Sequence, residues 1–499
     1  MLFTDPVFVF GFLPLALLCF HLTLHRVGGE MAINVLVLAS LVFYGMWSQI
    51  YLLLLVAQLL ANWLLAGRIA ALARTGSPTG RWLAAGVALN LALLGYFKYR
   101  NFFLQTVSDL GGPTFDLAPL FVPLGISFHT FQQIAFLADV ADEAEERHNL
   151  RHYMLFVLFF PQLIAGPIVL HQEMGRQLEQ LGQSRRIGFE RIVPGLVVFC
   201  FGLFKKVCLA DNIAPYADAA FAWPVHLALF EAWGGVLAYA LQLFLDFSGY
   251  SDMAVGLGLM FGLILPFNFD HPFRATSMIE YWKRWHITMT RFFTMYLYTP
   301  LALALYRRVE ARNAGRILSF VSVTALPTFL TFLASGLWHG AGWTFIAFGL
   351  VNGIGLVVNH IWNAAQPRRL PNLLGWALTA GCILVTLIYF RSGSLAQAHA
   401  ILKAMVDPHG LGLPTFLTDM LHLHLPHPVD FQVFDSPPVL ARLLGWLALL
   451  GPLALLLPNP AKAPLTLIPS ARMALALSLI IWLSLGWINE PRTFLYFQF

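Results

Sequence analysis

The chain has 499 residues, of which 58% are hydrophobic and only 11% are charged, whereas soluble domains carry about 25% charged residues. This composition excludes an ordinary soluble globular protein and indicates an integral membrane protein. The formal net charge of +5 is a topology signal rather than a sign of nucleic-acid binding, because Lys and Arg gather in short loops that the positive-inside rule places in the cytoplasm.

Apolar runs of about 20 residues, the length that crosses a bilayer as a helix, recur from one end of the chain to the other. We expect an all-α polytopic membrane protein with roughly a dozen transmembrane helices plus re-entrant or interfacial helices. The first run is expected to stay as a span, because no small-residue cleavage site follows it. The predicted spans are residues 6–24, 31–47, 50–66, 82–97, 153–170, 192–210, 227–247, 317–338, 343–362, 373–390, 439–457 and 473–487.

The loops between these runs give an orientation and no separate soluble domain. The richest basic stretches are residues 176–191, with Lys205 and Lys206 after them, and residues 274–316, so both are predicted to face the cytoplasm. The extended loop at 407–438 has few basic residues and is predicted to lie outside. We therefore expect residues 1–499 to form a single membrane domain.

Polar residues are informative in such a chain, because an ionisable group at membrane depth must line a cavity or find a partner. The stretch "LQLFLDFSGYSDMAVGLGLMFG" at 241–262 places Asp246, Tyr250 and Asp252 inside a helical run. We expect these three side chains to line the polar wall of a tunnel. A helix break with locally satisfied carboxylates is the alternative.

The stretch "FRATSMIEYWKRWHITMTRFFTMYLYTP" at 273–300 combines tryptophans with Lys283, Arg284 and Arg291. Aromatics and cations mixed in this way are typical of an interfacial helix, so membrane anchoring explains most of the pattern. At helical spacing His286 shares a face with Trp282 and points away from Arg284. His286 is therefore predicted to face protein.

His339 lies in "GLWHGAGWT" at 336–344, at the end of a long apolar run. The neighbouring glycines let the backbone open and approach a substrate closely. A lone buried histidine is usually a hydrogen-bonded core residue. Two such histidines in one polar region, each beside a tryptophan, favour a functional role.

Several motifs in order resemble those of the membrane-bound O-acyltransferase family, in its alginate O-acetyltransferase branch. They are "RWHIT" (284–288), "LWHGAGWTFIAFGLVNG" (337–353), "PLGISFHTFQQIAFLADV" (123–140), "FPQLIAGPIVLHQE" (160–173), "GLFKKVCLADNIAPYAD" (202–218), the 241–262 stretch and the terminal "FLYFQF". The motif-bearing core is about residues 120–365. The chain departs from the branch at Met295, where close relatives usually have an acidic residue followed by a Pro-Leu-Gly-Gly turn.

The resemblance implies a multi-helix fold around a tunnel in a bacterial inner membrane, where a cytoplasmic acyl thioester meets a hydroxyl acceptor. The donor would be acetyl-CoA or another acyl thioester, and no bound cofactor or metal is implied. The acceptor would be an extracytoplasmic polysaccharide such as alginate or cellulose, reached directly or through a periplasmic acyl-carrying partner protein. By similarity His339 is the catalytic histidine and His286 the second signature position, with Trp282 and Trp338 beside them along the tunnel.

The chemistry of the residues agrees with that implication. Transfer from an activated thioester to an alcohol needs a base for the hydroxyl proton and donors that face the developing oxyanion. A histidine pKa of about 6.5 suits the base, and no G-x-S-x-G motif suggests a serine nucleophile. His286 could hold His339, orient the acceptor or polarise the thioester carbonyl. Lys283, Arg284 and Arg291 are predicted to attract an anionic donor; anchoring to lipid head groups is the alternative.

Three other interpretations stay open at this point. A secondary transporter would carry intramembrane Asp and His, but should show matching broken helices in two halves. A bis-histidine haem protein would use His286 and His339 as axial ligands. The histidines of the 407–438 loop resemble a zinc site in composition, but irregular spacing favours a wet loop that contacts a partner or glycan. These histidines are His409, His422, His424 and His427.

Overall fold

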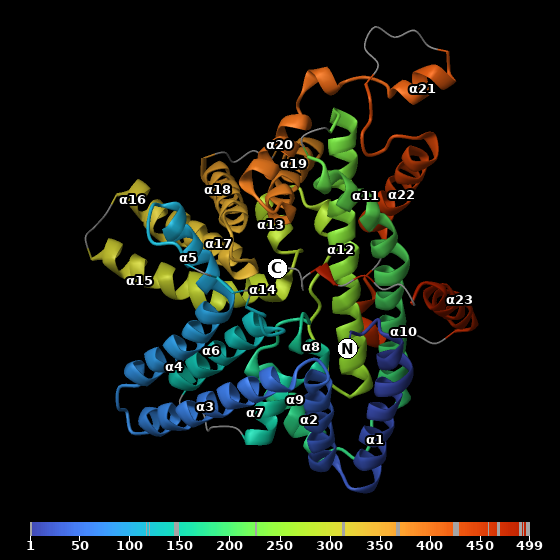
Figure 1. Ribbon diagram of the computed structural model, residues 1–499. Helices are drawn as coiled ribbons and strands as arrows, with labels where there is room; N and C mark the ends of the chain where they lie inside the picture. The colour runs from blue at the N-terminus through green and yellow to red at the C-terminus, as the bar shows by residue number, and fades with distance from the viewer. Residues whose placement is uncertain are drawn as a thin grey trace. The chain divides into compact units, whose positions relative to one another are not determined.

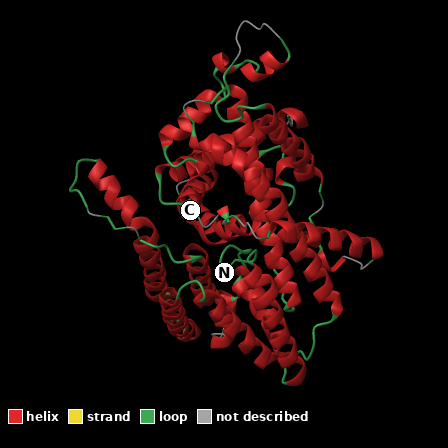
Figure 2. Cartoon of the chain, turned by 45° about the vertical axis from the view of Figure 1, so that its right-hand side comes forward, coloured by secondary structure: helices red, strands yellow, loops and turns green. Residues whose placement is uncertain are grey.

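The computed structural model describes residues 2–115, 117–118, 120–143, 149–224, 227–311, 315–365, 370–422, 429–457, 459–466, 470–488, 492 and 494–495. Within these ranges the chain consists of helices and loops with one isolated bridge between Pro414 and Val429 (Figures 1 and 2). The predicted all-α fold class is confirmed.

The helices divide into two compact units. The first unit comprises Met1–Phe204, Gly249–Phe267 and Pro460–Pro491, and the second comprises Lys205–Ser248, Asn268–Asn459 and Arg492–Phe499. Helix α12 (Leu229–Met260) contributes residues to both.

The helices of the first unit are α1 (Leu13–Arg26), α2 (Gly29–Gly45), α3 (Gln49–Arg74), α4 (Gly80–Leu94), α5 (Arg100–Asp109), α6 (Ile126–Glu143), α7 (Leu150–Leu158), α8 (Phe160–Leu163), α9 (His171–Gln183), α10 (Phe189–Phe204) and α23 (Ala471–Trp487). Those of the second are α11 (Asp211–Ala222), α13 (Met278–Trp282), α14 (Ile287–Phe293), α15 (Thr299–Glu310), α16 (Arg316–Phe320), α17 (Leu326–His339), α18 (Trp343–Ala365), α19 (Asn372–Arg391), α20 (Leu395–Ala404), α21 (Thr415–Met420) and α22 (Pro437–Leu456). A wider π-helical turn at Phe8–Phe12 leads into α1, and further π-helical turns join neighbouring helices end to end at Gly95–Tyr99, Lys205–Ala210, Thr294–Tyr298 and Val321–Ala325.

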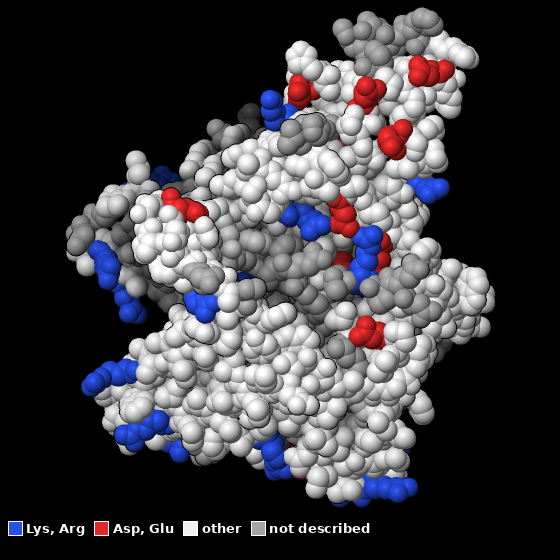
Figure 3. All heavy atoms as spheres, viewed as in Figure 1, with Lys and Arg blue, Asp and Glu red and all other residues white. Residues whose placement is uncertain are grey.

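Eight helical segments of the described chain are long and apolar enough to cross a membrane, and α2 and α23 are shorter apolar helices. The protein is therefore a multi-pass membrane protein. On the face drawn in Figure 3 most of the described surface is uncharged, and charged side chains stand in small groups. Such a surface suits contact with lipid, since charged groups are costly in the hydrocarbon region.

The predicted span at 153–170 is wrong. Helix α7 ends at Leu158, Phe159 leaves helical geometry with ψ of 106°, and α8 is only four residues long. Apart from the partly exposed Met154 and Leu170, the residues of this run are buried. The run is therefore hydrophobic because it packs in the core of the first unit. Pro161 and Pro167 are tolerated there because the run does not continue as a helix.

An amide network holds three helices of the first unit together. Asn62 of α3 donates to Gln133 of α6 at 2.8 Å, and Asn90 of α4 donates to Asn62 at 2.6 Å. Gln58 of α3 donates to Asn90 at 2.8 Å. Amide side chains that bond across helices act as glue in a membrane protein, where the hydrophobic effect between helices is weak.

Close approach of two helices fixes the end of α17 in the second unit. A Cβ added at Gly336 of α17 would lie 2.3 Å from the carbonyl oxygen of Phe345 and 3.0 Å from the backbone nitrogen of Gly349 in α18. Only glycine permits this packing. The contact places the last turn of α17 against α18, directly before His339.

The long helix α12 runs without a break through Asp246, Tyr250 and Asp252, so the helix break in the predicted alternative is wrong. The satisfied carboxylate of that alternative is found at Asp246, which pairs with Lys206 at 2.6 Å. The first turn of α12 is anchored by Glu231, which is fully buried. The Glu231 carboxylate accepts from the backbone N–H groups of Val433 at 2.7 Å and Phe434 at 2.9 Å. This buried acceptor ties the segment before α22 to the second unit.

Candidate active site

His286 sits at a break between two short helices. Ser277 caps α13 by accepting from the Glu280 N–H at 3.2 Å, and α13 ends at Trp282. His286 then has φ of 44° and ψ of 53°, and α14 begins at the next residue. The assumption of continuous helical spacing from Trp282 was therefore wrong, but the prediction that His286 faces protein is confirmed, because none of its surface is exposed.

Asn268 sets the tautomer of His286. The Asn268 Oδ1 atom accepts from the Thr288 backbone N–H at 3.3 Å and from Thr288 Oγ1 at 2.6 Å. A backbone N–H can only donate, so this Asn268 atom is the carbonyl oxygen. His286 Nδ1 lies 3.3 Å from the same oxygen and must therefore be the protonated nitrogen. The acceptor lone pair of the neutral ring is then on Nε2.

Burial also keeps this ring neutral. The segment that carries His286 is not one of the eight described segments that are long and apolar enough to cross a membrane. Burial lowers the pKa of His286 to about 3, because an imidazolium loses its hydration in an apolar surrounding. At neutral pH the side chain is therefore an uncharged imidazole.

The indole of Trp338 packs against both histidines. The ring centroid of Trp338 lies 6.0 Å from that of His286 and 4.7 Å from that of His339. The other signature tryptophan, Trp282, is buried and donates from Nε1 to Asn352 of α18 at 3.3 Å. The second unit thus brings both predicted histidines and both predicted tryptophans into one aromatic cluster.

His339 borders a small pocket. It is the last residue of α17, is 6% exposed, and packs against Phe390 of α19 and Phe348 of α18 with ring centroids 5.1 and 5.6 Å away. The cavity beside it measures about 20 Å³, room for one water. Its walls are mostly apolar and aromatic: Leu243, Phe247, Tyr281, Trp282, Trp285, Phe348, Thr386, Leu387 and Phe390. An acyl group can enter this pocket only if side chains move.

The three polar residues of α12 are all buried but belong to different units. Asp246 is in the second unit, 1% exposed, and its Oδ1 lies 2.6 Å from Lys206 Nζ. Tyr250 and Asp252 are in the first unit, where Tyr250 stacks on Phe3 with ring centroids 4.7 Å apart. The prediction that they line a tunnel stays a prediction.

The predicted donor-binding cations differ in their surroundings. Arg284 is bound to Glu280, with Nη2 2.8 Å from Oε1, and donates to the Asp270 carbonyl at 3.1 Å. Burial raises the pKa of Glu280, but hydrogen bonds from Thr276 and Arg284 outweigh it and leave the pKa below its ordinary value. Lys283 is exposed and Arg291 is half-buried. Arg284 thus has a structural partner, whereas Lys283 faces outward.

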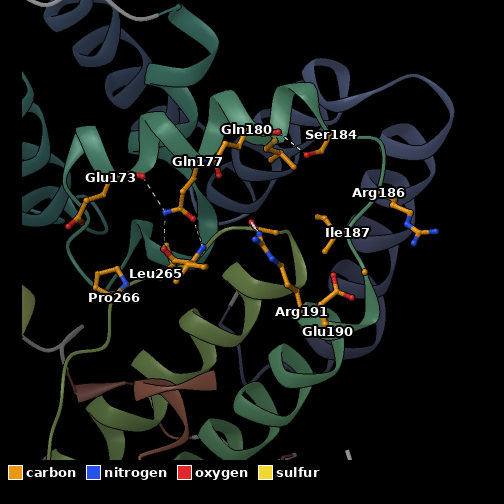
Figure 4. A pocket seen from close by; sticks show the side chains of 14 residues that line it. Glu173, Gln177, Gln180, Ser184, Arg186, Ile187, Glu190, Arg191, Leu265 and Pro266 are labelled. Atoms are coloured by element: carbon orange, nitrogen blue, oxygen red, sulfur yellow. Dashed lines mark hydrogen bonds between the residues drawn. The ribbon is translucent and has the colours of Figure 1, made fainter. Parts of the chain in front are cut away.

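A larger pocket lies in the first unit and shares no residue with the histidine cluster. It measures about 580 Å³ and is lined by α9, the start of α10 and the loop at 262–266 (Figure 4). Gln177 exchanges hydrogen bonds with the backbone of Ile264 at 2.7 and 3.1 Å, and Arg191 donates to the Gly262 carbonyl at 2.7 Å. These groups hold the loop in place.

Comparison with known proteins assigns the chain to a family. The sequence profile of the membrane-bound O-acyltransferase family matches residues 97–388. The chain belongs to this family.

The names of similar proteins agree with this family. The peptidoglycan O-acetyltransferase of Helicobacter pylori is 38% identical over 442 residues, which are 83% of this chain and 81% of the relative. The probable alginate O-acetylase AlgI of Pseudomonas aeruginosa is 36% identical over 411 residues, 81% of this chain and 75% of the relative. A teichoic acid D-alanyltransferase of Streptococcus thermophilus is 26% identical over 243 residues, 48% of this chain and 57% of the relative.

The chain is therefore a membrane-bound O-acyltransferase, and the transporter and haem-protein alternatives are set aside. Within the described residues, no three His, Cys, Asp or Glu side chains are grouped so that they could hold a metal ion. Of the histidines in the 407–438 loop, His424 and His427 lie outside the described residues.

Sequence analysis missed two residues of this acyltransferase site. Asn268 orients His286 from 18 positions upstream, in a stretch without a strong periodic pattern. Phe390 reaches His339 from the end of α19, where it looked like one more apolar residue of a span. Neither position had a signal in the sequence, because each acts through a tertiary contact.

Proposed function

We propose that this acyltransferase moves an acetyl group from a cytoplasmic acyl thioester, such as acetyl-CoA, to a hydroxyl of an extracytoplasmic glycan in the bacterial inner membrane. The glycan is peptidoglycan or an alginate-like polysaccharide, reached directly or through an acyl-carrying partner protein. The names of the relatives support acetyl as the group and a cell-surface polymer as the acceptor. The observation that carries the assignment of the site is that His339, not His286, borders the pocket.

In this mechanism His339 is the general base. Its imidazole takes the proton of the acceptor hydroxyl while the oxygen attacks the carbonyl carbon of the thioester. The C–O bond forms, the C–S bond breaks, and the departing thiolate receives the proton. The apolar walls of the pocket exclude water, which would otherwise compete with the acceptor as a nucleophile.

His286 is a positioning residue in this proposal. It is fully buried and neutral, and it packs against Trp338, which packs in turn against His339. Its Asn268 hydrogen bond fixes the ring plane, and the ring packs against the indole. Loss of His286 should therefore damage transfer less than loss of His339.

The test is acetyl transfer by purified protein in nanodiscs, with His339→Ala compared against His399→Ala. His399 is an exposed histidine of α20 and serves as the matched control. We expect His339→Ala to lose about 10²- to 10⁴-fold of the transfer rate and the control to keep it. Normal transfer by a well-folded His339→Ala protein would refute the proposed base.

The acceptor is tested in cells. Mass spectrometry of peptidoglycan and of secreted polysaccharide, from a deletion strain with and without the gene restored, should show acetyl groups that depend on the gene in one of these polymers. Unchanged acetylation of every surface glycan would refute the proposed acceptor class.

A further inference from the structure

A short segment near the C-terminus packs into the second unit beside the histidine cluster. Phe494 and Leu495 are 2% and 3% exposed, although they follow the partly exposed Arg492. The segment makes two polar anchors, one through the Leu495 backbone and one through the Arg492 side chain.

The first anchor is Asp246, whose two carboxylate oxygens have different partners. Oδ1 lies 2.6 Å from Lys206 Nζ, which also lies 2.6 Å from Asp211, and Oδ2 accepts the Leu495 N–H at 3.0 Å. A carboxylate that is 1% exposed needs such partners, because an uncompensated buried charge is strongly destabilising. The Leu495 N–H is thus one of the groups that satisfy this buried carboxylate.

Asp246 is followed directly by Phe247, which contacts His286. The two rings meet edge to face with centroids 4.7 Å apart. Phe494 lies on Phe247 as well, with centroids 6.0 Å apart. The segment therefore contacts the Phe247 ring directly and binds the residue before it, Asp246, through the side-chain carboxylate.

The second anchor is Asp218 of α11. Its carboxylate is shared by Arg492, 2.5 Å from Oδ2, and Arg391, 2.7 Å from Oδ1. Arg391 follows Phe390, whose ring lies 5.1 Å from that of His339. The same segment is thus linked to Phe390, which packs against His339, through the charge-assisted pairing of Arg492 and Arg391 with Asp218.

We propose that Arg492, Phe494 and Leu495 form a positioning element of the acyl-transfer site, which holds Phe247 against His286 and Phe390 against His339. The element contacts neither histidine directly and acts through Asp246 and Asp218. This inference rests on the proposed function for its kinetic test, because a displacement of about 1 Å in a catalytic group can cost about 10²-fold in rate.

The decisive variant is Leu495→Pro, since proline has no backbone N–H to donate to Asp246. Leu495→Ala is the matched control, because it keeps that N–H. We expect Leu495→Pro to lower kcat by about 10- to 100-fold with an unchanged KM for the thioester, and Leu495→Ala to keep most of kcat. Arg492→Gln should also lower kcat, and Arg492→Lys should restore part of it.

A second measurement does not depend on activity. Diethyl pyrocarbonate modification, read by mass spectrometry, reports the protection of His286 in wild type and in both Leu495 variants. We expect His286 to be protected in wild type and Leu495→Ala and to react faster in Leu495→Pro. If wild type shows no acyl transfer, the proposed function fails while this readout still tests the positioning.

Three outcomes would overturn the inference. One is equal kcat and equal His286 protection in Leu495→Pro and Leu495→Ala. Another is additive loss of kcat in Leu495→Pro combined with Asp246→Ala, because both changes remove the same hydrogen bond and their effects should not add. If Leu495→Pro fails to fold, Arg492→Gln replaces it, and a rise in KM with unchanged kcat for that variant would refute the positioning role.

Discussion

The Asn268 side chain offers a sharp test of how His286 is set, because one oxygen meets three donors. Asn268→Leu removes that oxygen and leaves His286 Nδ1–H and both Thr288 donors facing an apolar group. A buried donor without an acceptor costs about 1–3 kcal/mol. We therefore expect a loss of several kcal/mol in the free energy of unfolding and a clear drop in the thermal midpoint.

Asn268→Asp keeps the three acceptor contacts but places a negative charge 3.3 Å from His286 Nδ1. A close carboxylate favours the imidazolium and should raise the pKa of His286 from about 3 by about 1–3 units. Protonation turns Nε2 from an acceptor into a donor. In Asn268→Asp the acid limb of the transfer rate should therefore move toward neutral pH, while the rate at high pH stays near wild type.

The assay is acetyl transfer in nanodiscs from pH 4.5 to 9, with thermal midpoints measured for each variant. Asn268→Leu should be less stable and less active at every pH, and Asn268→Asp should be impaired only on the acid side. Identical pH profiles for wild type and a folded Asn268→Asp protein would refute the assignment of Nδ1–H to the Asn268 bond.

Three further predictions concern topology, the donor and stability. Single cysteines near Arg185 and Arg307, in a background without the native cysteines, should resist an impermeant maleimide on whole cells, and labelling at both would reverse the predicted orientation. Lys283→Glu should raise the KM for acetyl-CoA and change the dependence on acceptor concentration little, because Lys283 is exposed and its charge attracts phosphates. An unchanged KM in the folded variant would mean that Lys283 only anchors the protein to lipid head groups. As the pH is lowered from 6.5 to 3, the free energy of unfolding of wild type should fall by up to about 1.4 kcal/mol per pH unit, because His286 gains a proton in the unfolded state and not in the folded state. Thermal melts across that range should show a weaker pH dependence of stability for His286→Asn.

Much of the fold could be predicted because lipid imposes a simple rule on sequence. An apolar run of spanning length must become a helix, since no other structure satisfies its backbone in hydrocarbon, and α17 to α19 follow their runs closely. The 153–170 run is an apolar run of nearly spanning length that does not form a spanning helix. A buried core segment and a lipid-facing span have the same composition, and only tertiary contacts separate them.

The histidine site divides in the same way. The sequence placed His339 at the end of an apolar helix, because the run stops at glycines, and α17 does end there. The same analysis treated 282–290 as one helix and missed the break at His286. A left-handed histidine has no strong local signal, since its conformation is held by Asn268 and Thr288 rather than by a glycine.

These two backbone positions give the histidines opposite electrostatic surroundings. His286 caps the N-terminus of α14, where the helix dipole is positive and opposes an imidazolium, in the same direction as its burial. His339 is the last residue of α17, at the negative end of the helix dipole. A base must become an imidazolium during transfer, so the helix end that favours this charge is the one that should carry the base. The pocket lies beside that same residue, so the helix end and the position of the pocket both support the proposed base.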